Sequence, residues 1–245
     1  MAVFYVRKEI VRMLDVSIII PFQTDHGIRA EEFEWIKKYY SRVMPEAELC
    51  VGLISEKDFN RSKAINLAVK KATKQVLVIA DGDIFYAPEI IAKSIELLDE
   101  AACVAPFTGV YNIDKTGTER LLKTEPKWPS DVKPEECTRE SFYPGFAGKL
   151  IVISKETFEK VGGFDERFIG WGGEDDAFSL SVQTLCGRLV NIPGELYHFW
   201  HPVSNYYTNP HGAENHALVS RYFHASGNKE QILNLINERN NNRGD

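Results

Sequence analysis

The chain has 245 residues, of which 44% are hydrophobic and 26% are charged, and its formal net charge is −6 at pH 7. This composition is ordinary for a globular protein and excludes a fibrous or low-complexity chain. Because a net negative charge disfavours general binding to nucleic acid, we expect no nucleic-acid partner. An anionic ligand would need a local cluster of cations or a bound metal ion.

The sequence lacks the features of a membrane protein or a disulfide-rich secreted protein. Its longest apolar runs, at 16–22 and 76–80, are far shorter than the ~20 residues that span a bilayer. Charges interrupt residues 1–14 too often for a secretory signal. The four cysteines are widely spaced and form neither a metal-binding pair nor a dense disulfide framework. We therefore expect a cytoplasmic protein without a transmembrane segment.

The first part of the chain alternates short apolar runs with amphipathic stretches. The apolar runs predict buried strands at 15–20, 47–54, 75–80 and 102–107. Helical periodicity predicts helices at 30–44, 60–73 and 88–100. Pro45 ends the first helix, and Pro88 opens the third. Strands that are apolar on both faces and joined by helices predict an α/β fold, with a mostly parallel central sheet and helices on both faces.

The second part of the chain is less regular. Residues 108–147 are rich in Pro, Thr and charge, and we expect an irregular insertion there. Regular structure resumes with the strand 149–154 and a short helix that Ser154 caps and Gly162–Gly163 end. The remaining predicted elements are a helix at about 174–185, strands at 188–192 and 195–200, and helices at 213–225 and 229–239. We expect one domain over residues 1–245, with a polar tail from about 238.

Two aspartates, Asp81 and Asp83, flank Gly82 directly after the third predicted strand. Asp-Gly also forms hairpin turns, but the following residues run into a proline-initiated helix instead of an alternating return strand. Ligands bind at the carboxyl ends of parallel strands. Paired carboxylates there suit Mg²⁺ or Mn²⁺, and such a cation would hold a diphosphate.

The stretch DFNRSKAIN places Arg61 and Lys63 at the start of the second predicted helix. Cations on an amphipathic helix usually face solvent. However, a cation at a helix N-terminus opposes the helix dipole, whereas the free N–H groups there favour phosphate. This favours a phosphate contact for Arg61. The preceding Phe59 is either a core residue or a stacking partner for a base.

The late stretch LYHFWH contains His198 and His201. A histidine among aromatic residues is most often a core residue. In a strand, residues three apart face opposite sides, so at most one of the two histidines would face Asp83. We predict that this is His198, because His201 precedes Pro202 and lies near a turn. Neutral imidazole ligates Mn²⁺ alongside carboxylate.

The stretch FIGWGGEDDAF, at 168–178, joins three glycines and a tryptophan to three consecutive acids. Acids in the first turn of a helix also favour the helix dipole without any other role. Glycines, however, permit close approach of a ligand to the backbone, and Trp171 offers a flat apolar face to a sugar or a base. A carboxylate at this place can act as a general base toward a hydroxyl.

Together these stretches resemble a GT-A glycosyltransferase, most closely the β-1,4-galactosyltransferase family and related bacterial family 2 glycosyltransferases. The matching stretches occur in order: IIIPF at 18–22, FNRSKAIN at 59–66, DGD at 81–83 and GGFDERFIGWGGEDDAF at 162–178, followed by the histidine in LYHFWH. The resemblance covers about residues 15 to 202. It implies a GT-A fold and a metal-dependent transferase.

The resemblance implies roles in binding the sugar donor. Pro21 and the loop that follows it, with Gln23, border the nucleotide. Phe59 stacks near the uracil. Arg61 contacts the diphosphate, and Asp81 lies near the ribose or the metal ion.

The resemblance also implies the metal ligands and the acceptor site. Asp83 and His198 ligate Mn²⁺, with Mg²⁺ as the alternative ion. Trp171 lines the sugar and acceptor site, and Glu174 helps to hold the acceptor. Asp175 is the base that deprotonates the attacking hydroxyl. Because the family inverts the anomeric configuration, a single displacement is implied.

The loop PFQTDHGIR after the first strand departs from the galactosyltransferase pattern, which places arginines after Pro-Phe. Gln23 takes the nearest position here, and Arg29 is a substitute from further along. The stretch FAGKLIVIS, at 146–154, also differs from the glycine-serine stretch of that family. The donor is therefore left open among UDP-Gal, UDP-GalNAc, UDP-GlcNAc and UDP-GlcA. The expected acceptor is a hydroxyl, with a glycan as the first candidate.

Two other functions remain as alternatives. A catalytically silent module that binds a nucleotide-sugar or a glycan would keep the fold, but it gives no reason for the complete set of acids and histidine. A sugar nucleotidyltransferase would need a glycine-rich basic loop after the first strand, and residues 21–29 contain one glycine and one arginine.

Overall fold

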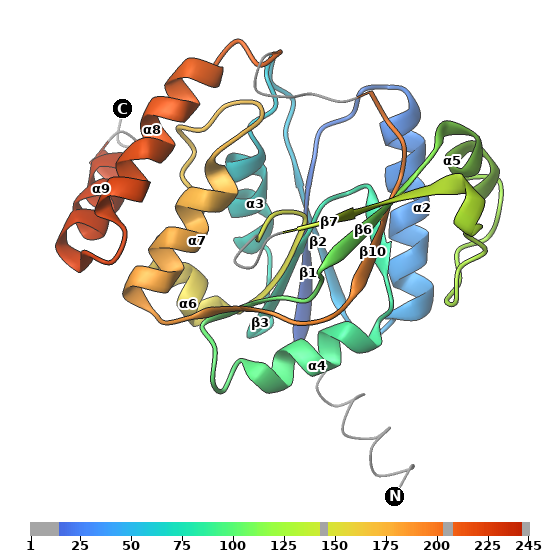
Figure 1. Cartoon of the computed structure of the whole chain (residues 1–245), viewed down its shortest axis with the longest axis horizontal. Helices are drawn as coiled ribbons and strands as arrows, with labels where there is room; N and C mark the ends of the chain where they lie inside the picture. Colours follow the sequence, from blue (N-terminus) through green and yellow to red (C-terminus); the bar gives the residue numbers. More distant parts are fainter. Residues whose placement is uncertain (1–14, 143–146, 203–207, 242–245) are drawn as a thin grey trace, which may run out of the picture.

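The structure, a computed structural model, describes residues 15–142, 147–202 and 208–241. The charged N-terminal stretch 1–14 and the last residues of the predicted tail, 242–245, lie outside the described residues. Two sheets and their covering helices make up the described part of the chain (Figure 1).

The central sheet has six strands in the order β2-β1-β3-β8-β5-β9. Its strands are β1 Val16–Phe22, β2 Glu48–Leu53, β3 Val76–Ala80, β5 Cys103–Ala105, β8 Leu150–Ser154 and β9 Leu189–Asn191. Only β8 runs against its neighbours, because β1 pairs in parallel with β2 and β3, and β5 pairs in parallel with β9. The predicted mostly parallel sheet is therefore confirmed.

A second sheet of four strands, in the order β4-β10-β6-β7, lies beside the first. Its strands are β4 Ile84–Tyr86, β6 Gly109–Ile113, β7 Cys137–Ser141 and β10 Glu195–His198. The prediction of an irregular insertion at 108–147 was wrong, since β6, helix α5 Lys115–Leu121, the 3-10 turn Pro134–Glu136 and β7 lie within it. Strand β7 is polar and mostly exposed, so its pairing with β6 defines it rather than any apolar pattern.

Strand β4, directly after the DGD stretch, was also missed. It pairs with β10 and not with β3. DGD therefore does not form a hairpin turn between β3 and β4, as the sequence analysis concluded. A short strand does follow DGD, but it belongs to the second sheet. The consequence is that Asp81 directly follows β3 of the central sheet and Asp83 directly precedes β4 of the second sheet, so Gly82 lies where the chain passes from one sheet to the other.

Helices cover both faces of the central sheet (Figure 1). Figure 1 shows α2 on one side and α3, α6 and α7 on the other, with α8 and α9 packed outside α7. Their bounds are α2 Ile28–Val43, α3 Arg61–Val69, α4 Glu89–Leu97, α6 Lys155–Lys160, α7 Glu174–Leu185, α8 Gly212–Ala225 and α9 Lys229–Asn241. In the described part of the chain, no helix is both long and apolar enough to cross a bilayer.

The helix ends are set locally, as the sequence predicts. The Ser154 hydroxyl accepts from the backbone N–H of Thr157 at the start of α6, and Gly162, with φ of +71°, follows the end of that helix. The Asn60 side chain likewise accepts from Lys63 N–H at the start of α3. This cap fixes where α3 begins, and Arg61 is the first residue of that helix.

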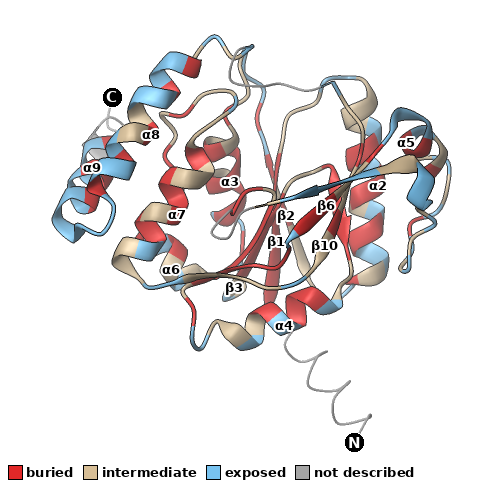
Figure 2. Cartoon of the chain, viewed as in Figure 1, coloured by how far each residue is buried: buried red, intermediate tan, exposed pale blue. Residues whose placement is uncertain are grey.

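The central strands form the core, which appears as the red interior in Figure 2. Residues 18–20 of β1 are fully buried. Helix α3 lies directly against β2, because a Cβ built on Gly52 would be 1.7 Å from the carbonyl oxygen of Ala64. Glycine at 52 thus permits the close approach that brings the start of α3 to the edge of the sheet.

Candidate active site

The first group of polar side chains is centred on Arg61 and is called here the Arg61 cluster: Arg61, Asp81, Glu174 and Asp175. The guanidinium donates from Nε and Nη2 to Oδ1 of Asp81, at 2.9 and 2.8 Å. Its Nη1 donates to Oδ1 of Asp175 at 2.8 Å and lies 3.7 Å from a carboxylate oxygen of Glu174. The members come from the start of α3, from the residue that follows β3 and from the start of α7, so three segments distant in sequence meet at one cation.

The Arg61 cluster changes the proton affinity of its acids. Burial, together with the nearby charges of Glu174 and Asp81, raises the pKa of Asp175 to about 7 against the opposing effect of the Arg61 charge. Burial also raises the pKa of Glu174, and Arg61 opposes that shift as well. A carboxyl whose pKa lies near neutrality is suited to accept a proton in that range.

The second group lies where β4 and β10 meet and is called here the Asp83 cluster: Asp83, His198 and His201. One oxygen of Asp83 lies 3.2 Å from Nε2 of His201, and the other lies 3.6 Å from Nε2 of His198. One ligand atom from each residue lies within 4.8 Å of the other two. Asp83 Oδ1 is buried and has no hydrogen-bond partner among the described residues. This donor set and the orphaned oxygen fit a divalent cation.

The prediction that at most one histidine would face Asp83 was wrong. Strand β10 ends at His198, so the alternation of a strand does not extend to His201. Both imidazoles therefore reach the same carboxylate, and their ring centroids are 5.1 Å apart. Burial, first of all, lowers the pKa of His198 to about 4, which keeps this imidazole neutral at physiological pH.

Asn112, which the sequence analysis did not single out, orients His198. Its Oδ1 lies 3.1 Å from Nδ1 of His198. With Nδ1 as the donor, Nε2 carries the lone pair and is directed toward Asp83, which is the tautomer that a metal ligand needs. No sequence signal marks this residue, because Asn112 lies in β6, a strand that was not predicted.

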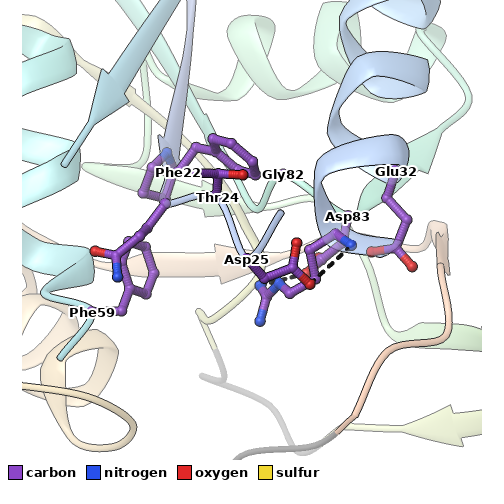
Figure 3. A pocket seen from close by; sticks show the side chains of 10 residues that line it. Phe22, Thr24, Asp25, Glu32, Phe59, Gly82 and Asp83 are labelled. Atoms are coloured by element: carbon purple, nitrogen blue, oxygen red, sulfur yellow. Dashed lines mark hydrogen bonds and ion pairs between the residues drawn. The ribbon is translucent and has the colours of Figure 1, made fainter. Parts of the chain in front are cut away.

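A pocket of about 230 Å³ opens next to Asp83. Its lining includes Pro21, Gln23 and Phe59, as the resemblance implied for the nucleotide. Figure 3 shows Phe59 at one end and Glu32 at the other, with Asp83 between them. The Gln23 amide is itself tied to the backbone of residue 56, since its Nε2 donates to that carbonyl at 2.9 Å and its Oε1 accepts from that N–H at 3.3 Å.

Arg29 enters the same pocket from the first turn of α2. Its Nη2 donates to Oδ2 of Asp83 at 3.1 Å. Burial opposes ionisation of Asp83, but the electrostatic influence of His198, the hydrogen bond from His201 and the Arg29 charge outweigh it and lower the pKa of Asp83. Asp83 is therefore a carboxylate.

Glu32 is a second residue of the site that sequence reasoning missed. It is fully buried, it lines the pocket, and neither of its carboxylate oxygens has a hydrogen-bond partner in the part of the chain that the structure describes. Burial, followed by the Asp83 charge, raises the pKa of Glu32 to about 8. In sequence, an acid in AEEFE looks like part of the solvent face of an amphipathic helix, and only the packing of α2 reveals its position.

The glycine-rich stretch before α7 forms a loop that contains the exposed Trp171. Gly173, the N-cap of α7, has a φ of +95°, and a Cβ there would lie 2.9 Å from the Phe168 ring. Asn209 Nδ2 donates to the Trp171 carbonyl at 2.9 Å, and Gly170 N–H donates to the Phe59 carbonyl at 2.9 Å. The Trp171 side chain is 53% exposed and does not line the pocket.

The structure thus brings most of the predicted site residues together in two adjoining groups. Asp81 and Asp83, two residues apart, link the groups, and the glycine-rich loop is joined by its backbone to the Phe59 segment. Trp171 belongs to neither group, because its side chain is exposed and does not line the pocket. Arg61, predicted as a diphosphate contact, is held by carboxylates in this structure.

Two family models match the chain. A model described as glycosyl transferase family 2 matches residues 34–162, which is just over half of the chain. The chain belongs to glycosyl transferase family 2. A model described as the N-terminal domain of galactosyltransferase matches residues 130–211. This family 2 chain is therefore related to the galactosyltransferases, as the sequence motifs indicate, and its family is one of enzymes.

Curated relatives agree with this assignment. N-acetylgalactosaminyltransferase 6 of Drosophila melanogaster is 27% identical over 197 residues, covering 74% of this chain and 27% of the relative. Human β-1,4-galactosyltransferase 4 is 46% identical over 41 residues, covering 17% of this chain and 12% of the relative. The chain thus spans well under half of the length of these two relatives.

A solved structure shares the fold. The crystal structure of GalNAc-T7 with UDP, GalNAc and Mn²⁺ aligns with a TM-score of 0.51 at 14% identity, covering 90% of this chain and 54% of that chain. At this identity the similarity is one of fold alone. It confirms the expected GT-A fold for the family 2 chain.

Proposed function

We propose that this protein is a metal-dependent, inverting glycosyltransferase that moves a sugar from a UDP-sugar to an acceptor hydroxyl. The observation that supports this most directly is the Asp83 cluster, whose three ligand atoms lie within 4.8 Å of one another, beside a pocket lined by Phe59. The pocket has a flat aromatic wall for a base at one end and a cation site next to it. That order matches the order of groups along a nucleoside diphosphate.

The cation is proposed to be held by Asp83, His198 and His201. When bound, it supplies positive charge to the departing diphosphate as a Lewis acid. Two imidazoles beside one carboxylate favour Mn²⁺ over Mg²⁺, which prefers a shell of oxygen ligands. A cation here also removes the electrostatic cost of the unpartnered Asp83 oxygen.

For the nucleotide, Phe59 is proposed to stack on uracil, with Pro21 and Gln23 at the rim of the pocket. Asp81 is placed to meet the ribose or the cation. Arg61 is proposed to reach the diphosphate, and it then exchanges part of its bonding to Asp81 and Asp175 for phosphate oxygens.

Asp175 is proposed as the general base. Its carboxylate takes the proton of the acceptor hydroxyl while the hydroxyl oxygen bonds to the anomeric carbon from the face opposite the leaving group. The bond from that carbon to the diphosphate oxygen breaks, and UDP keeps the electron pair, so the configuration inverts. The raised pKa of Asp175 places this proton transfer near neutral pH.

Glu174 and Trp171 are proposed to position the acceptor, Glu174 by hydrogen bonds and Trp171 by stacking on a sugar ring. A glycan is the proposed acceptor, and the donor is one of UDP-Gal, UDP-GalNAc, UDP-GlcNAc and UDP-GlcA. GalNAc-T7, which shares the fold, is described with UDP, GalNAc and Mn²⁺, and this supports a UDP-sugar donor here. The cytoplasmic location stays a prediction.

The test is UDP release. The protein is incubated with Mn²⁺ and each of the four UDP-sugars, with and without a panel of glycan acceptors, and free UDP is measured. We expect release from one donor, loss of release with a chelator, and recovery with added Mn²⁺. If no donor releases UDP, and calorimetry with Mn²⁺ detects no UDP binding, the proposal fails. Binding of UDP without release from any donor would instead indicate a catalytically silent module.

A further inference from the structure

Lys149 has an unusual backbone conformation at the start of β8. Its φ is +68°, which lies in the left-handed region. Among the described non-glycine residues, His26 is the only other one with a positive φ. This region is sterically costly for any residue with a Cβ. Glycine would relax the backbone at this position, so the presence of a lysine suggests that its side chain is needed there.

Lys149 lies directly across from the first aspartate of the DGD stretch. Its carbonyl accepts from the Asp81 N–H at 2.9 Å, and the next residue, Leu150, pairs with Ala80 in the β3–β8 ladder. The backbone of Lys149 is therefore fixed at the carboxyl end of β3, at the edge of the sheet that the Arg61 and Asp83 clusters share.

The Lys149 ammonium has no ion-pair or hydrogen-bond partner within residues 15–142, 147–202 and 208–241. Its side chain is nevertheless partly buried. A partly buried lysine without an anion beside it is incompletely satisfied, since a lysine at a protein surface usually extends into water. Its charge is one of the influences that, after burial, lower the pKa of His198, so the ammonium lies within electrostatic reach of the Asp83 cluster.

The other two cations of the site are already engaged. Arg61 is bonded to Asp81 and Asp175, and Arg29 is bonded to Asp83. A nucleoside diphosphate would bring at least two negative charges to a site that already contains several carboxylates. A cation without a competing carboxylate partner can meet that charge without breaking an existing ion pair.

We propose that Lys149 binds the diphosphate of the nucleotide donor and stabilises it as the leaving group. This inference rests on the proposed function and adds a phosphate ligand to it. As the bond between the anomeric carbon and the diphosphate oxygen breaks, the electron pair stays on that oxygen. Lys149 donates a charge-assisted hydrogen bond to the diphosphate and keeps its proton.

The test compares ligands that differ only in phosphate. UDP and uridine are each titrated by calorimetry, in the presence of Mn²⁺, into the wild-type protein, Lys149→Met and the control Lys93→Met, which removes an exposed lysine from α4. We expect Lys149→Met to weaken UDP binding by about tenfold and to leave uridine binding unchanged. Lys93→Met should leave both unchanged.

A second variant separates ligand binding from folding. Lys149→Gly removes the side chain and relieves the left-handed conformation, so we expect its melting temperature to rise while its affinity for UDP falls. A lysine with a purely structural role would give the opposite, a lower melting temperature with unchanged affinity for UDP.

Two results would overturn the inference, and they are distinguishable. If wild-type protein binds UDP and Lys149→Met binds it equally well, Lys149 is not a phosphate ligand, and the proposed function stands. If wild-type protein does not bind UDP at all, the proposed function fails and the role of Lys149 fails with it.

Discussion

The Arg61 cluster and the Asp83 cluster lie side by side at the edge of the sheet, but they differ in how their charge is balanced. In the Arg61 cluster one guanidinium donates to both Asp81 and Asp175. Around the Asp83 cluster, Asp83 Oδ1 and both oxygens of Glu32 are buried without a hydrogen-bond partner within residues 15–142, 147–202 and 208–241. In the Arg61 cluster the charged groups have partners within the protein, and we call it the satisfied region. The surroundings of Asp83 and Glu32 contain the unpartnered oxygens, and we call them the unsatisfied region.

This difference has a physical reading. A buried polar atom without a partner costs free energy in the empty protein, and a ligand that supplies the missing charge or hydrogen bond recovers it. The unsatisfied region is therefore where a cation and nucleotide would contribute most. The satisfied region holds its acids in place before any ligand arrives, as a catalytic base requires.

The largest expected effect comes from Asp175→Asn. If Asp175 is the base, the variant should lose about 10³-fold or more in kcat, while its Kd for UDP in the presence of Mn²⁺ stays within about twofold. Measured in wild-type protein, kcat/KM should rise with pH through about 7, because only the ionised carboxyl accepts the proton. Asp176→Asn, one residue further along α7, is the matched control. Near-normal turnover in Asp175→Asn would exclude this residue as the base.

The next effect tests the unsatisfied region. Asp83→Asn should weaken Mn²⁺ binding by about 100-fold, because it removes the only carboxylate of the Asp83 cluster. His198→Ala and His201→Ala should each weaken it as well. Calorimetry with Mn²⁺ alone measures this without reference to activity. Asp99→Asn, which removes an exposed acid remote from the site, serves as control.

If only one of the two histidine variants alters Mn²⁺ affinity, the Asp83 cluster is a site with one histidine ligand. If none of the three variants alters Mn²⁺ affinity, the Asp83 cluster is not the metal site, and its unpartnered oxygen does not indicate ligand binding.

A smaller effect is expected when the satisfied region is broken. Arg61→Met leaves Asp81 and Asp175 without their cation, and we expect the free energy of unfolding to fall by about 2 kcal/mol at pH 8. The loss should shrink as the pH falls below 7, since Asp175 then takes up a proton. Denaturant titration at several pH values measures this. A pH-independent loss would show that the guanidinium acts through packing instead.

The smallest effect concerns Glu32. Its pKa is raised from an ordinary value near 4.5 to about 8, so the folded protein binds a proton that the unfolded chain releases between these values. Stability should therefore be highest below about pH 4.5 for this group, and should decline as the pH rises toward 8. With a chelator present, Glu32→Gln should remove this decline and be about 1 kcal/mol more stable than wild-type protein at pH 8. If the free energy of unfolding depends on pH in the same way in Glu32→Gln and in wild-type protein, Glu32 is not a carboxyl with a raised pKa.

Much of the local structure could be predicted from the sequence. Helix α7 begins at Glu174 and ends at Leu185, as predicted, because its acidic first turn and the glycines before it are local signals. Ser154 caps α6 for the same kind of reason. The candidate residues of DGD and GWGGEDD were found because these signals are short and continuous in the chain.

Other features had no local signal. Strand β7 is polar and exists through its pairing with β6, so the second sheet was not predicted. Glu32 lies on a helix whose amphipathic pattern indicates solvent at that position. The prediction that His201 would face away from Asp83 assumed that side chains alternate as in a strand, but β10 ends at His198.

The sequence by itself determined the order of the elements, their caps and the set of residue types at the strand ends, because these depend on neighbours within a few positions. Only the tertiary structure decided which charges meet. Arg61 and Asp175 are 114 positions apart, and the partner of a cation is chosen by how α3 and α7 pack against the sheet. The same packing left Glu32 and one oxygen of Asp83 without hydrogen-bond partners among the residues that the structure describes, and no pattern of residues along the chain contains that information.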